Sequence, residues 1–481
     1  MDKINAYQTH YEITDYNMGD CVNLEQSLAI WDDVYYRNDY KVYYDEDKRV
    51  LYVPRGYSAD KLSYYFDRGI NYVKEHTSTR DINFSMKLLP KNDLQREAIR
   101  FMCGVQEYKD TKKASQIVVS LPTGEGKTYC ACASMSVYGY ASLIIVNTED
   151  LKTQWRNALV EYSTLSYRDI CDIESTSQAM KLYNGKKRDL TKHKVYITTH
   201  STIRNIIKNN GGDVLSDLMD RLGIGIKIID EAHLEFDSTL NIDNYTNVYK
   251  TIYLSATFSR SDNREDTVFQ RCFEKVFKFC KVNENRRKHV IYIPFIFNSR
   301  PSSAFQAMIK GIKGFDKNRY IDYQFTDGNI INHVNAVMDL FESKNIEGIT
   351  LLLSSKKESC DIFKREIEKL YPDLKVCVHY SGSKVDDLTE YDVICATPRM
   401  LGTGKDIRGL RKVINTEPMR SKTNSVQLIG RLREYAPDKD TYYVELVDKG
   451  FSTVMSMYND RRRLFSPLVK SLKIIDLTKK R

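Results

Sequence analysis

The stretch IVVSLPTGEGKT, residues 117–128, decides which fold this chain should adopt. An apolar segment runs into a glycine-containing loop, a Lys-Thr pair and a helical pattern, which is the context that a phosphate-binding loop requires. Gly124 and Gly126 let backbone N–H groups approach phosphate oxygens, and the start of the following helix adds positive potential. Lys127 is expected to reach the β- and γ-phosphates, and the Thr128 hydroxyl is expected to ligate Mg²⁺.

The loop departs from the general phosphate-loop pattern at its first position. That pattern, GxxxxGK[ST], requires glycine where this chain has Leu121, so the motif is the relaxed [AS]xxTGxGKT form. Thr123 and Glu125 belong to the same loop and are included among the expected nucleotide-binding residues. A chance turn is the alternative for so short a pattern, and the flanking strand and helix argue against it.

A second motif follows the apolar segment at residues 226–229 and reads Asp230-Glu231-Ala232-His233. An Asp at the carboxyl end of a buried strand lies at the sheet edge where ligands bind, so Asp230 is expected to hold Mg²⁺. Glu231 is expected to orient or deprotonate the attacking water. A polar cap after a strand is the simpler alternative, but the two motifs together form an ATPase signature.

Short apolar runs bounded by polar loops occur in two series, which indicates strands buried on both faces of parallel sheets. The first series comprises residues 117–120, 143–146, 195–198, 226–229 and 252–254. The second comprises residues 349–353, 376–379, 393–396, 412–414 and 442–446. Two doubly wound α/β domains in tandem are therefore predicted, at residues 88–284 and 285–481, with a polar linker over residues 282–289.

Residues 1–87 differ in composition and hold 13 of the 34 tyrosines. Two strand-like runs flank the acidic turn at residues 45–47 like a hairpin, and residues 59–73 have helical spacing. These features predict a small α+β accessory domain, with fork or duplex DNA as a possible ligand. Core packing is the favoured explanation for its tyrosines, and base stacking is the alternative.

Composition excludes several classes of protein. Ten cysteines without a CxxC pair argue against a disulfide scaffold or a zinc ribbon, and the histidines lack metal-ligand spacing. The polar N-terminus and the short apolar runs predict neither a secretory signal nor a membrane span, so a cytoplasmic protein is expected. The net charge is +9, with −4 on residues 1–87 and +13 on the remainder, so an anionic partner should bind the later domains.

The order of Lys127-Thr128, Asp230-Glu231-Ala232-His233 and Ser255-Ala256-Thr257 resembles motifs I, II and III of DEAH-type superfamily 2 helicases and translocases. Further matches lie around Gln95, at Gln154-Trp155, at Thr198-Thr199-His200, from Ala396 to Ile407, and from Gln427 to Arg431. The QW pair and the compact motor are most similar to the UvsW and XPB group, which includes small phage DNA helicases.

The resemblance implies two tandem RecA-like domains after the N-terminal domain, with ATP and Mg²⁺ as cofactors. It implies that catalysis uses Lys127, Asp230, Glu231, Gln427 and Arg431. Nucleotide contacts beyond the loop are expected from Gln95, Gly404, Asp406, Arg431 and Arg433. Nucleic-acid contacts are expected from Gln154, Trp155, Thr199 and Thr397, although a core position is the favoured alternative for Trp155. His233, Ser255 and Thr257 are expected to couple ATP hydrolysis to the binding of nucleic acid.

The second arginine of motif VI departs from the family pattern. The family places it three residues after the first, whereas Arg433 follows Arg431 by two. On a helix that spacing turns the two side chains apart by about 200°. Arg431 is therefore the expected arginine finger, and Arg433 is left with either DNA or the phosphate as a partner.

The leading hypothesis is an ATP-dependent DNA helicase that unwinds or branch-migrates forks or junctions in replication, recombination or repair. The alternatives are a double-strand translocase of a restriction-type system, an RNA helicase or transcript-release ATPase, and a nucleic-acid sensor whose motor has decayed. The expected partner is forked, branched or single-stranded DNA, with RNA possible, and the expected state is a monomer or weak oligomer.

Overall fold

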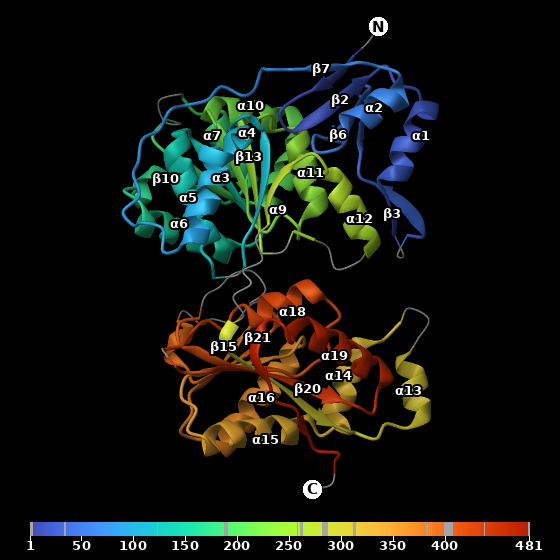
Figure 1. The fold of residues 1–481 in the computed structure, drawn as a ribbon, viewed down its shortest axis with the longest axis vertical. Coiled ribbons are helices and arrows are strands. Elements are labelled where there is room, and N and C mark those ends of the chain that lie inside the picture. Colours follow the sequence, from blue (N-terminus) through green and yellow to red (C-terminus); the bar gives the residue numbers. More distant parts are fainter. Residues whose placement is uncertain are drawn as a thin grey trace. The chain divides into compact units, whose positions relative to one another are not determined.

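A computed structural model describes residues 3–32, 35–122, 124–186, 191–256, 258–259, 263–280, 287–310, 314–380, 383, 385, 387–398, 407–436 and 438–479. The chain divides into two compact units, residues 1–282 and residues 283–481. Each unit is built around one large parallel sheet (Figure 1). The three-domain division at residues 1–87, 88–284 and 285–481 stays a prediction.

The first unit contains a seven-stranded parallel sheet in the order β10-β11-β9-β12-β13-β8-β14. All five predicted strands of this series are present, each within a few residues of its expected bounds, and the edge strands β10 and β14 were not predicted. The strands are β8 (Gln116–Ser120), β9 (Ser142–Val146), β10 (Ile170–Ile173), β11 (Val195–Thr199), β12 (Ile226–Ile229), β13 (Lys250–Ser255) and β14 (Phe277–Cys280).

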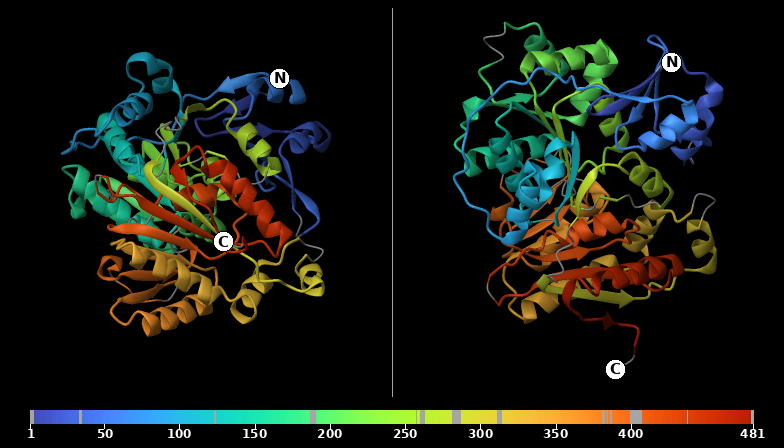
Figure 2. Two further views of the ribbon diagram at one scale, coloured as in Figure 1. Left: turned by 60° about the horizontal axis from the view of Figure 1, so that its bottom comes forward. Right: turned by 45° about the horizontal axis from the view of Figure 1, so that its top comes forward.

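Helices cover both faces of this sheet, which explains why its central strands are apolar throughout (Figure 2). Alternate strand residues point to opposite faces: Ile117 and Val119 join the core under one helical layer, and Val118 joins the other. The first layer comprises α3 (Asp93–Cys103), α5 (Lys127–Tyr138) and α6 (Glu149–Tyr162), with η1 (Gln106–Tyr108) and α4 (Lys109–Lys113) beside α3 and η2 (Tyr167–Asp169) after α6. The second comprises α7 (Thr176–Tyr183), α9 (His200–Asn210), α10 (Gly212–Leu222), α11 (Phe236–Asn244) and α12 (Asn263–Cys272).

The N-terminal region forms its own five-stranded sheet in the order β5-β6-β2-β1-β7, beside α11 and α12 (Figure 1). The predicted hairpin is present as the antiparallel pair β5 and β6. The remaining elements include the two-stranded β3–β4 ribbon. The elements are β1 (Ile4–Ala6), β2 (His10–Thr14), α1 (Met18–Ser27), β3 (Ala29–Asp32), β4 (Arg37–Tyr40), β5 (Tyr43–Asp45), β6 (Val50–Pro54), α2 (Ala59–Phe66) and β7 (Ile70–Tyr72).

The predicted helix over residues 59–73 is wrong in its second half. The helix α2 ends at Phe66, because Asp67 adopts a left-handed conformation with φ of +47°. The chain then forms β7, which pairs in parallel with β1. The backbone N–H and C=O groups of this segment can be hydrogen-bonded either in a longer helix or in a strand at the edge of this sheet. The spacing of apolar residues alone could therefore not distinguish the two.

The N-terminal region shares one hydrophobic core with the second helical layer of the large sheet. Its Tyr11 and Tyr57 are buried in that core, whereas Tyr35, Tyr36 and Tyr64 are largely exposed. Core packing therefore explains only part of the tyrosine content. From β7 the chain crosses the outside of the unit as an extended segment that reaches α3 (Figures 1 and 2).

The second unit contains an eight-stranded sheet with the order β17-β18-β16-β19-β20-β15-β21, and β22 also pairs with β15. All five predicted strands of the second series are present. The strands are β15 (Arg287–Phe297), β16 (Ile349–Leu353), β17 (Val376–His379), β18 (Val393–Ala396), β19 (Leu410–Asn415), β20 (Thr441–Asp448), β21 (Val469–Leu472) and β22 (Ile475–Asp476). The two tandem parallel-sheet domains of the RecA-like type, preceded by an α+β region, are thus confirmed.

Helices again cover both faces of the second sheet. One layer comprises α15 (Ile330–Ser343) and α16 (Lys357–Leu370). The other comprises α13 (Ser303–Ile309), α14 (Lys317–Thr326), α18 (Lys422–Ile429) and α19 (Ser452–Phe465), and η3 (Leu388–Glu390) precedes β18. The predicted linker over residues 282–289 is wrong at its end, because β15 begins at Arg287; residues 281–286 lie outside the described residues.

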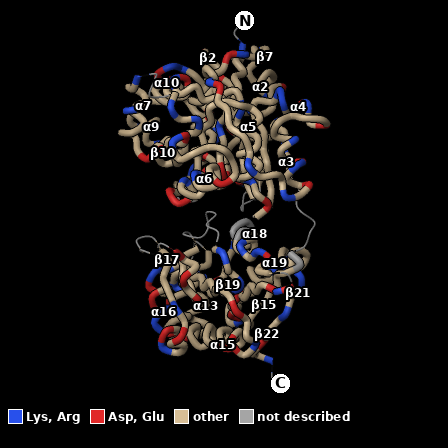
Figure 3. The backbone as a smooth tube through the Cα atoms, turned by 90° about the vertical axis from the view of Figure 1, so that its left-hand side faces the viewer, with Lys and Arg blue, Asp and Glu red and all other residues tan. Residues whose placement is uncertain are grey.

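Charged residues of both signs are interspersed along the two units (Figure 3). One arginine from the basic run at residues 461–463 is not on the surface: the Arg461 side chain is buried and forms an ion pair with Glu445. In the part of the chain that the structure describes, no helix has the length and apolarity needed to span a bilayer.

We predict that Gly56→Ala destabilises the first unit. A Cβ at Gly56 would lie 2.3 Å from the Cys272 carbonyl oxygen and 2.9 Å from the Phe273 Cα, so backbone must move. Overpacking of this kind costs about 1–3 kcal/mol in free energy of unfolding, to be measured by urea denaturation. Gly69→Ala is the control, since no described heavy atom lies within 4 Å of its Cβ position. Equal stability of the two variants would contradict the prediction.

Candidate functional site

The candidate site lies at the carboxyl ends of three adjacent strands, β8, β13 and β12. The glycine-containing loop follows β8, Ser255 ends β13, and Asp230 follows β12. Backbone hydrogen bonds join these ends: the Leu121 N–H donates to the Ser255 carbonyl at 3.1 Å, and the Ala232 N–H donates to the Leu254 carbonyl at 3.1 Å. The sheet therefore brings together three motifs that lie far apart in the sequence.

The loop before α5 depends on glycine at two positions. Gly124 and Gly126 have φ of +92° and +85°, and Gly126 is the N-cap of α5. Positive φ favours glycine because it has no Cβ. Lys127 and Thr128 form the first turn of α5, so backbone N–H groups and the positive end of the helix dipole face the loop.

Gln95 holds this loop from the neighbouring helix α3. Its side-chain amide donates to the Glu125 carbonyl at 3.0 Å, and its Oε1 accepts from the Lys91 N–H at 2.8 Å. A Cβ at Gly126 would lie 2.4 Å from Gln95 Nε2, so the close approach also requires glycine. Gln95 thus supports the loop backbone, and its contact with adenine stays a prediction. Thr123 lies outside the described residues.

Lys127 and Glu231 form the central ion pair, with 2.7 Å between Nζ and Oε1. The other oxygen of Glu231 accepts a hydrogen bond from the Ala256 N–H at 3.2 Å. His233 Nδ1 lies 3.4 Å from the same oxygen and 2.7 Å from Ser255 Oγ. Glu231, His233 and Ser255 are therefore joined in one polar network. The coupling role of His233 and Ser255 stays a prediction, and Thr257 lies outside the described residues.

Burial and charge push the pKa values of the two neighbouring carboxyl groups apart. Burial, together with the negative charge of Glu231, raises the pKa of Asp230 to about 6. Burial alone would also raise the pKa of Glu231, but the positive charges of Lys127 and His233 outweigh it and lower that pKa. Glu231 is thereby kept ionised near neutral pH, as a residue that accepts a proton from water must be.

The oxygen ligands available at this edge of the sheet fit a Mg²⁺ ion that binds together with a nucleotide. Thr128 supplies a half-buried hydroxyl and Asp230 a carboxylate, which are the hard oxygen ligands that Mg²⁺ prefers. Across the described ranges, no group of three or more His, Cys, Asp or Glu side chains forms a metal cage. Mg²⁺ characteristically uses one or two protein oxygens and completes its shell with phosphate oxygens and water.

Two of the residues expected to contact nucleic acid are buried. The Trp155 side chain is 1% exposed, and its Nε1 donates to Asp230 Oδ2 at 2.8 Å. The Thr199 side chain is 2% exposed and accepts from the Thr202 N–H at the start of α9. Trp155 therefore occupies a core position, and the contact of these two residues with nucleic acid stays a prediction. Gln154 is exposed, Thr397 is buried at the end of β18, and their nucleic-acid roles stay predictions.

In the second unit, α18 ends at Ile429, before both arginines of the last motif. The Arg431 N–H donates to the Leu428 carbonyl at 3.1 Å in a turn after the helix. Arg431 is half-buried and Arg433 is exposed. The helical angle assumed between the two arginines is therefore wrong. Gln427 lies within α18 but its side chain is outside the described part, as are residues Gly404 and Asp406.

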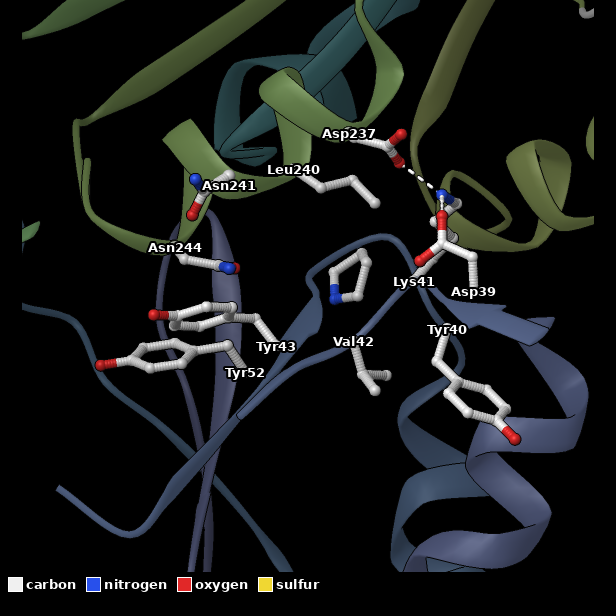
Figure 4. A pocket seen from close by; sticks show the side chains of 11 residues that line it. Asp39, Tyr40, Lys41, Val42, Tyr43, Tyr52, Asp237, Leu240, Asn241 and Asn244 are labelled. Atoms are coloured by element: carbon white, nitrogen blue, oxygen red, sulfur yellow. Dashed lines mark hydrogen bonds and ion pairs between the residues drawn. The ribbon is translucent and has the colours of Figure 1, made fainter. Parts of the chain in front are cut away.

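A separate pocket of about 150 Å³ lies where the N-terminal region meets α11 (Figure 4). Lys41 bridges Asp39 and Asp237 at its rim, with distances of 2.5 Å and 2.6 Å. Tyr43 and Tyr52 lie against its other end. The sequence carried no signal for this pocket, because its two walls lie about two hundred residues apart in the chain.

Comparison with known proteins finds similarity over much of the chain. Residues 88–260 match the family model described as the res subunit of type III restriction enzymes. The DNA 3'-5' helicase XPB of Mycobacterium tuberculosis is 28% identical over 153 residues, which cover 32% of this chain and 25% of that protein. The transcript termination protein A18 of Ectromelia virus is 21% identical over 404 residues, covering 79% of this chain and 75% of that protein.

A solved structure supports the fold. Dbp5 of S. cerevisiae, bound to RNA and ADP BeF3, matches with a TM-score of 0.53 and 11% identity, covering 80% of this chain and 89% of that chain. The aligned part of this chain spans only about a quarter of the length of XPB.

We predict that Glu231→Gln lowers ATP turnover by about 10²–10⁴-fold, because the amide cannot accept a proton from water. Steady-state phosphate release measures this, and calorimetric binding of ATP shows that the nucleotide site is retained. Glu235→Gln is the matched control, since Glu235 pairs with Arg204 at 2.8 Å, away from Lys127. Near-normal turnover by Glu231→Gln would exclude Glu231 as the base.

Proposed function

From the premise that this chain is a superfamily 2 helicase of the UvsW/XPB-like group, we propose that it is an ATP-dependent DNA helicase or translocase that remodels forked or junction DNA. The observation that carries the proposal is the Lys127–Glu231 ion pair beside Asp230, at the adjacent ends of β8 and β12. Phosphoryl transfer asks a protein mainly for positioning and charge compensation, and this edge offers both.

Each residue at the edge has a defined part in hydrolysis. ATP lies on the loop at Gly124 and Gly126, where the N-terminus of α5 stabilises phosphate charge. Lys127 exchanges its contact with Glu231 for the β- and γ-phosphates, and Glu231 then orients water and accepts its proton. Thr128 and Asp230 would hold Mg²⁺, which would neutralise charge on the phosphates.

Motifs of the second unit supply further catalytic and nucleotide-binding residues in this proposal. Arg431 contributes the arginine finger, Gln427 acts in catalysis, and Gly404 and Asp406 help to bind the nucleotide. Conformational changes on ATP binding and phosphate release convert hydrolysis into movement along a strand.

Nucleic acid is held through its backbone in this proposal, with exposed Gln154 on α6 as one contact. The similarity to the DNA 3'-5' helicase XPB supports DNA as the substrate. Action at forks or junctions in replication, recombination or repair is the finer part of this proposal. The similarity to protein A18, which extends over most of both chains, supports transcript release as the second candidate. A restriction-type translocase is the third, by the family match over residues 88–260. A cytoplasmic setting, in the host cell if the chain is viral, and a monomer or weak oligomer belong to the same proposal.

A substrate panel tests the proposed function. ATP turnover and unwinding are compared on single strands, plain duplex, forks, four-way junctions and matched RNA, with triplex displacement on duplex. Forks or junctions should support unwinding. Preference for RNA would favour transcript release, and triplex displacement without unwinding would favour a translocase. If no polynucleotide stimulated ATP turnover, the remaining hypothesis would be a nucleic-acid sensor that has lost its motor activity.

We predict that nucleic-acid-stimulated turnover falls steeply between about 50 and 200 mM salt, because backbone contacts release counterions. The measurement is ATP turnover at a fixed, subsaturating DNA concentration. Turnover without DNA, measured over the same range, controls for salt effects on the ATP site itself. Stimulated turnover that does not change over this salt range would contradict binding of DNA through its phosphates.

We predict that Arg431→Ala lowers stimulated turnover by about 10³–10⁵-fold, the usual loss for an arginine finger. Arg433→Ala is the matched comparison, because it removes an exposed arginine two residues further along. Turnover and DNA affinity are measured for both variants. Normal turnover by Arg431→Ala would show that another residue supplies the finger.

A further inference from the structure

Trp155 connects two motifs that the site description treats separately. It lies on α6, immediately after the exposed Gln154, and its ring is almost entirely buried. The indole Nε1 donates to Asp230 Oδ2 at 2.8 Å, and Asp230 is itself only 8% exposed. The bond therefore links a helix expected to face nucleic acid with the carboxylate expected to hold Mg²⁺.

The geometry restricts how the Asp230 carboxylate can turn. Its Oδ1 accepts from the Glu231 N–H at 3.1 Å, and its Oδ2 accepts from the indole. An indole N–H only donates, so it favours the acceptor form of the carboxylate, and each carboxylate oxygen keeps a further lone pair for a metal. A hydrogen bond to a metal-ligating carboxylate orients that ligand.

We propose that Trp155 is a positioning residue for Asp230, which sets the orientation of the Mg²⁺-ligating carboxylate and ties it to α6. This inference rests on the proposed function, since it takes Asp230 to be a Mg²⁺ ligand. Leu151 and Leu159 on the same helix are buried in the core beneath it, so the helix holds the indole in a fixed place beside the carboxylate.

Packing alone is the competing explanation, because Trp155 is one of the largest fully buried side chains in the chain. The two explanations differ in what happens when the N–H is removed and the aromatic ring is kept. A packing role predicts a loss of stability that affects nucleotide binding equally with and without Mg²⁺. A positioning role predicts a loss confined to the Mg²⁺-dependent part of binding.

The test is calorimetric binding of ADP to the full chain, with Mg²⁺ and with EDTA, for the wild type, Trp155→Phe and Trp31→Phe. Trp31 is the other tryptophan of the chain and is partly exposed on the β3–β4 ribbon, which makes it the matched control. The gain in affinity that Mg²⁺ provides should shrink by about 10-fold in Trp155→Phe, as for other partners of metal ligands. An unchanged gain, or equal losses with Mg²⁺ and with EDTA, would overturn the proposal.

A second measurement does not alter Trp155. In Trp31→Phe it is the only tryptophan, so the emission spectrum reports its surroundings directly. Mg²⁺ with ADP should change this emission more than ADP with EDTA does, and identical spectra would overturn the proposal. Both measurements depend on nucleotide binding and not on unwinding. A substrate panel without DNA unwinding would therefore contradict the proposed DNA function but would not affect the test of Trp155 as a positioning residue.

Discussion

The ion pair between Lys127 and Glu231 joins loops whose residues are 104 positions apart, and it exists because β8 and β12 both border β13. After β8 the chain forms β9 further along the sheet, continues outward to β10 and β11, and then returns to place β12 and β13 between β9 and β8. All strands are parallel, and their carboxyl ends therefore share one edge. The phosphate loop, the acidic pair and Ser255 meet at that edge without long connecting loops.

The same edge gives two adjacent carboxyl groups different properties. Asp230 is buried next to another carboxylate and has a raised pKa, whereas Glu231 has Lys127 as a direct partner and a lowered one. Environments that push neighbouring pKa values apart are how one site assigns separate roles to similar groups. The buried Trp155 indole adds a directional restraint on Asp230 that charge alone would not provide.

The N-terminal region is structurally part of the first unit, through a buried polar network as well as through its core. Asp243 on α11 accepts from Lys227 at 2.6 Å and from Tyr253 at 2.5 Å, and its carbonyl accepts from Thr9 Oγ1 at 2.7 Å. Removing one member of such a network leaves a buried charge without its partner, which is strongly destabilising. The network therefore holds β12, β13, α11 and the residue that precedes β2 in one arrangement.

Local patterns in the sequence were sufficient for the elements whose chemistry is contained in a few neighbouring residues. The central strands are apolar throughout because helices cover them on both sides, and the phosphate loop requires glycine, lysine and threonine in order, so both could be predicted. The strands β10 and β14 of the first sheet and β15, β21 and β22 of the second were not predicted, because pairing with another strand decides them and pairing is not local. The end of α2 was missed because it depends on the left-handed conformation of Asp67.

The sequence by itself determined which residues are expected to carry out the chemistry: Lys127, Asp230, Glu231 and Arg431 were predicted from motif order. Only the tertiary structure decided where side chains point. It buried Trp155 against Asp230, placed Thr199 in a helix cap and set Gln95 against the loop backbone. The reason is physical: a motif constrains backbone and residue type over a few positions, whereas burial depends on which distant segments pack against it.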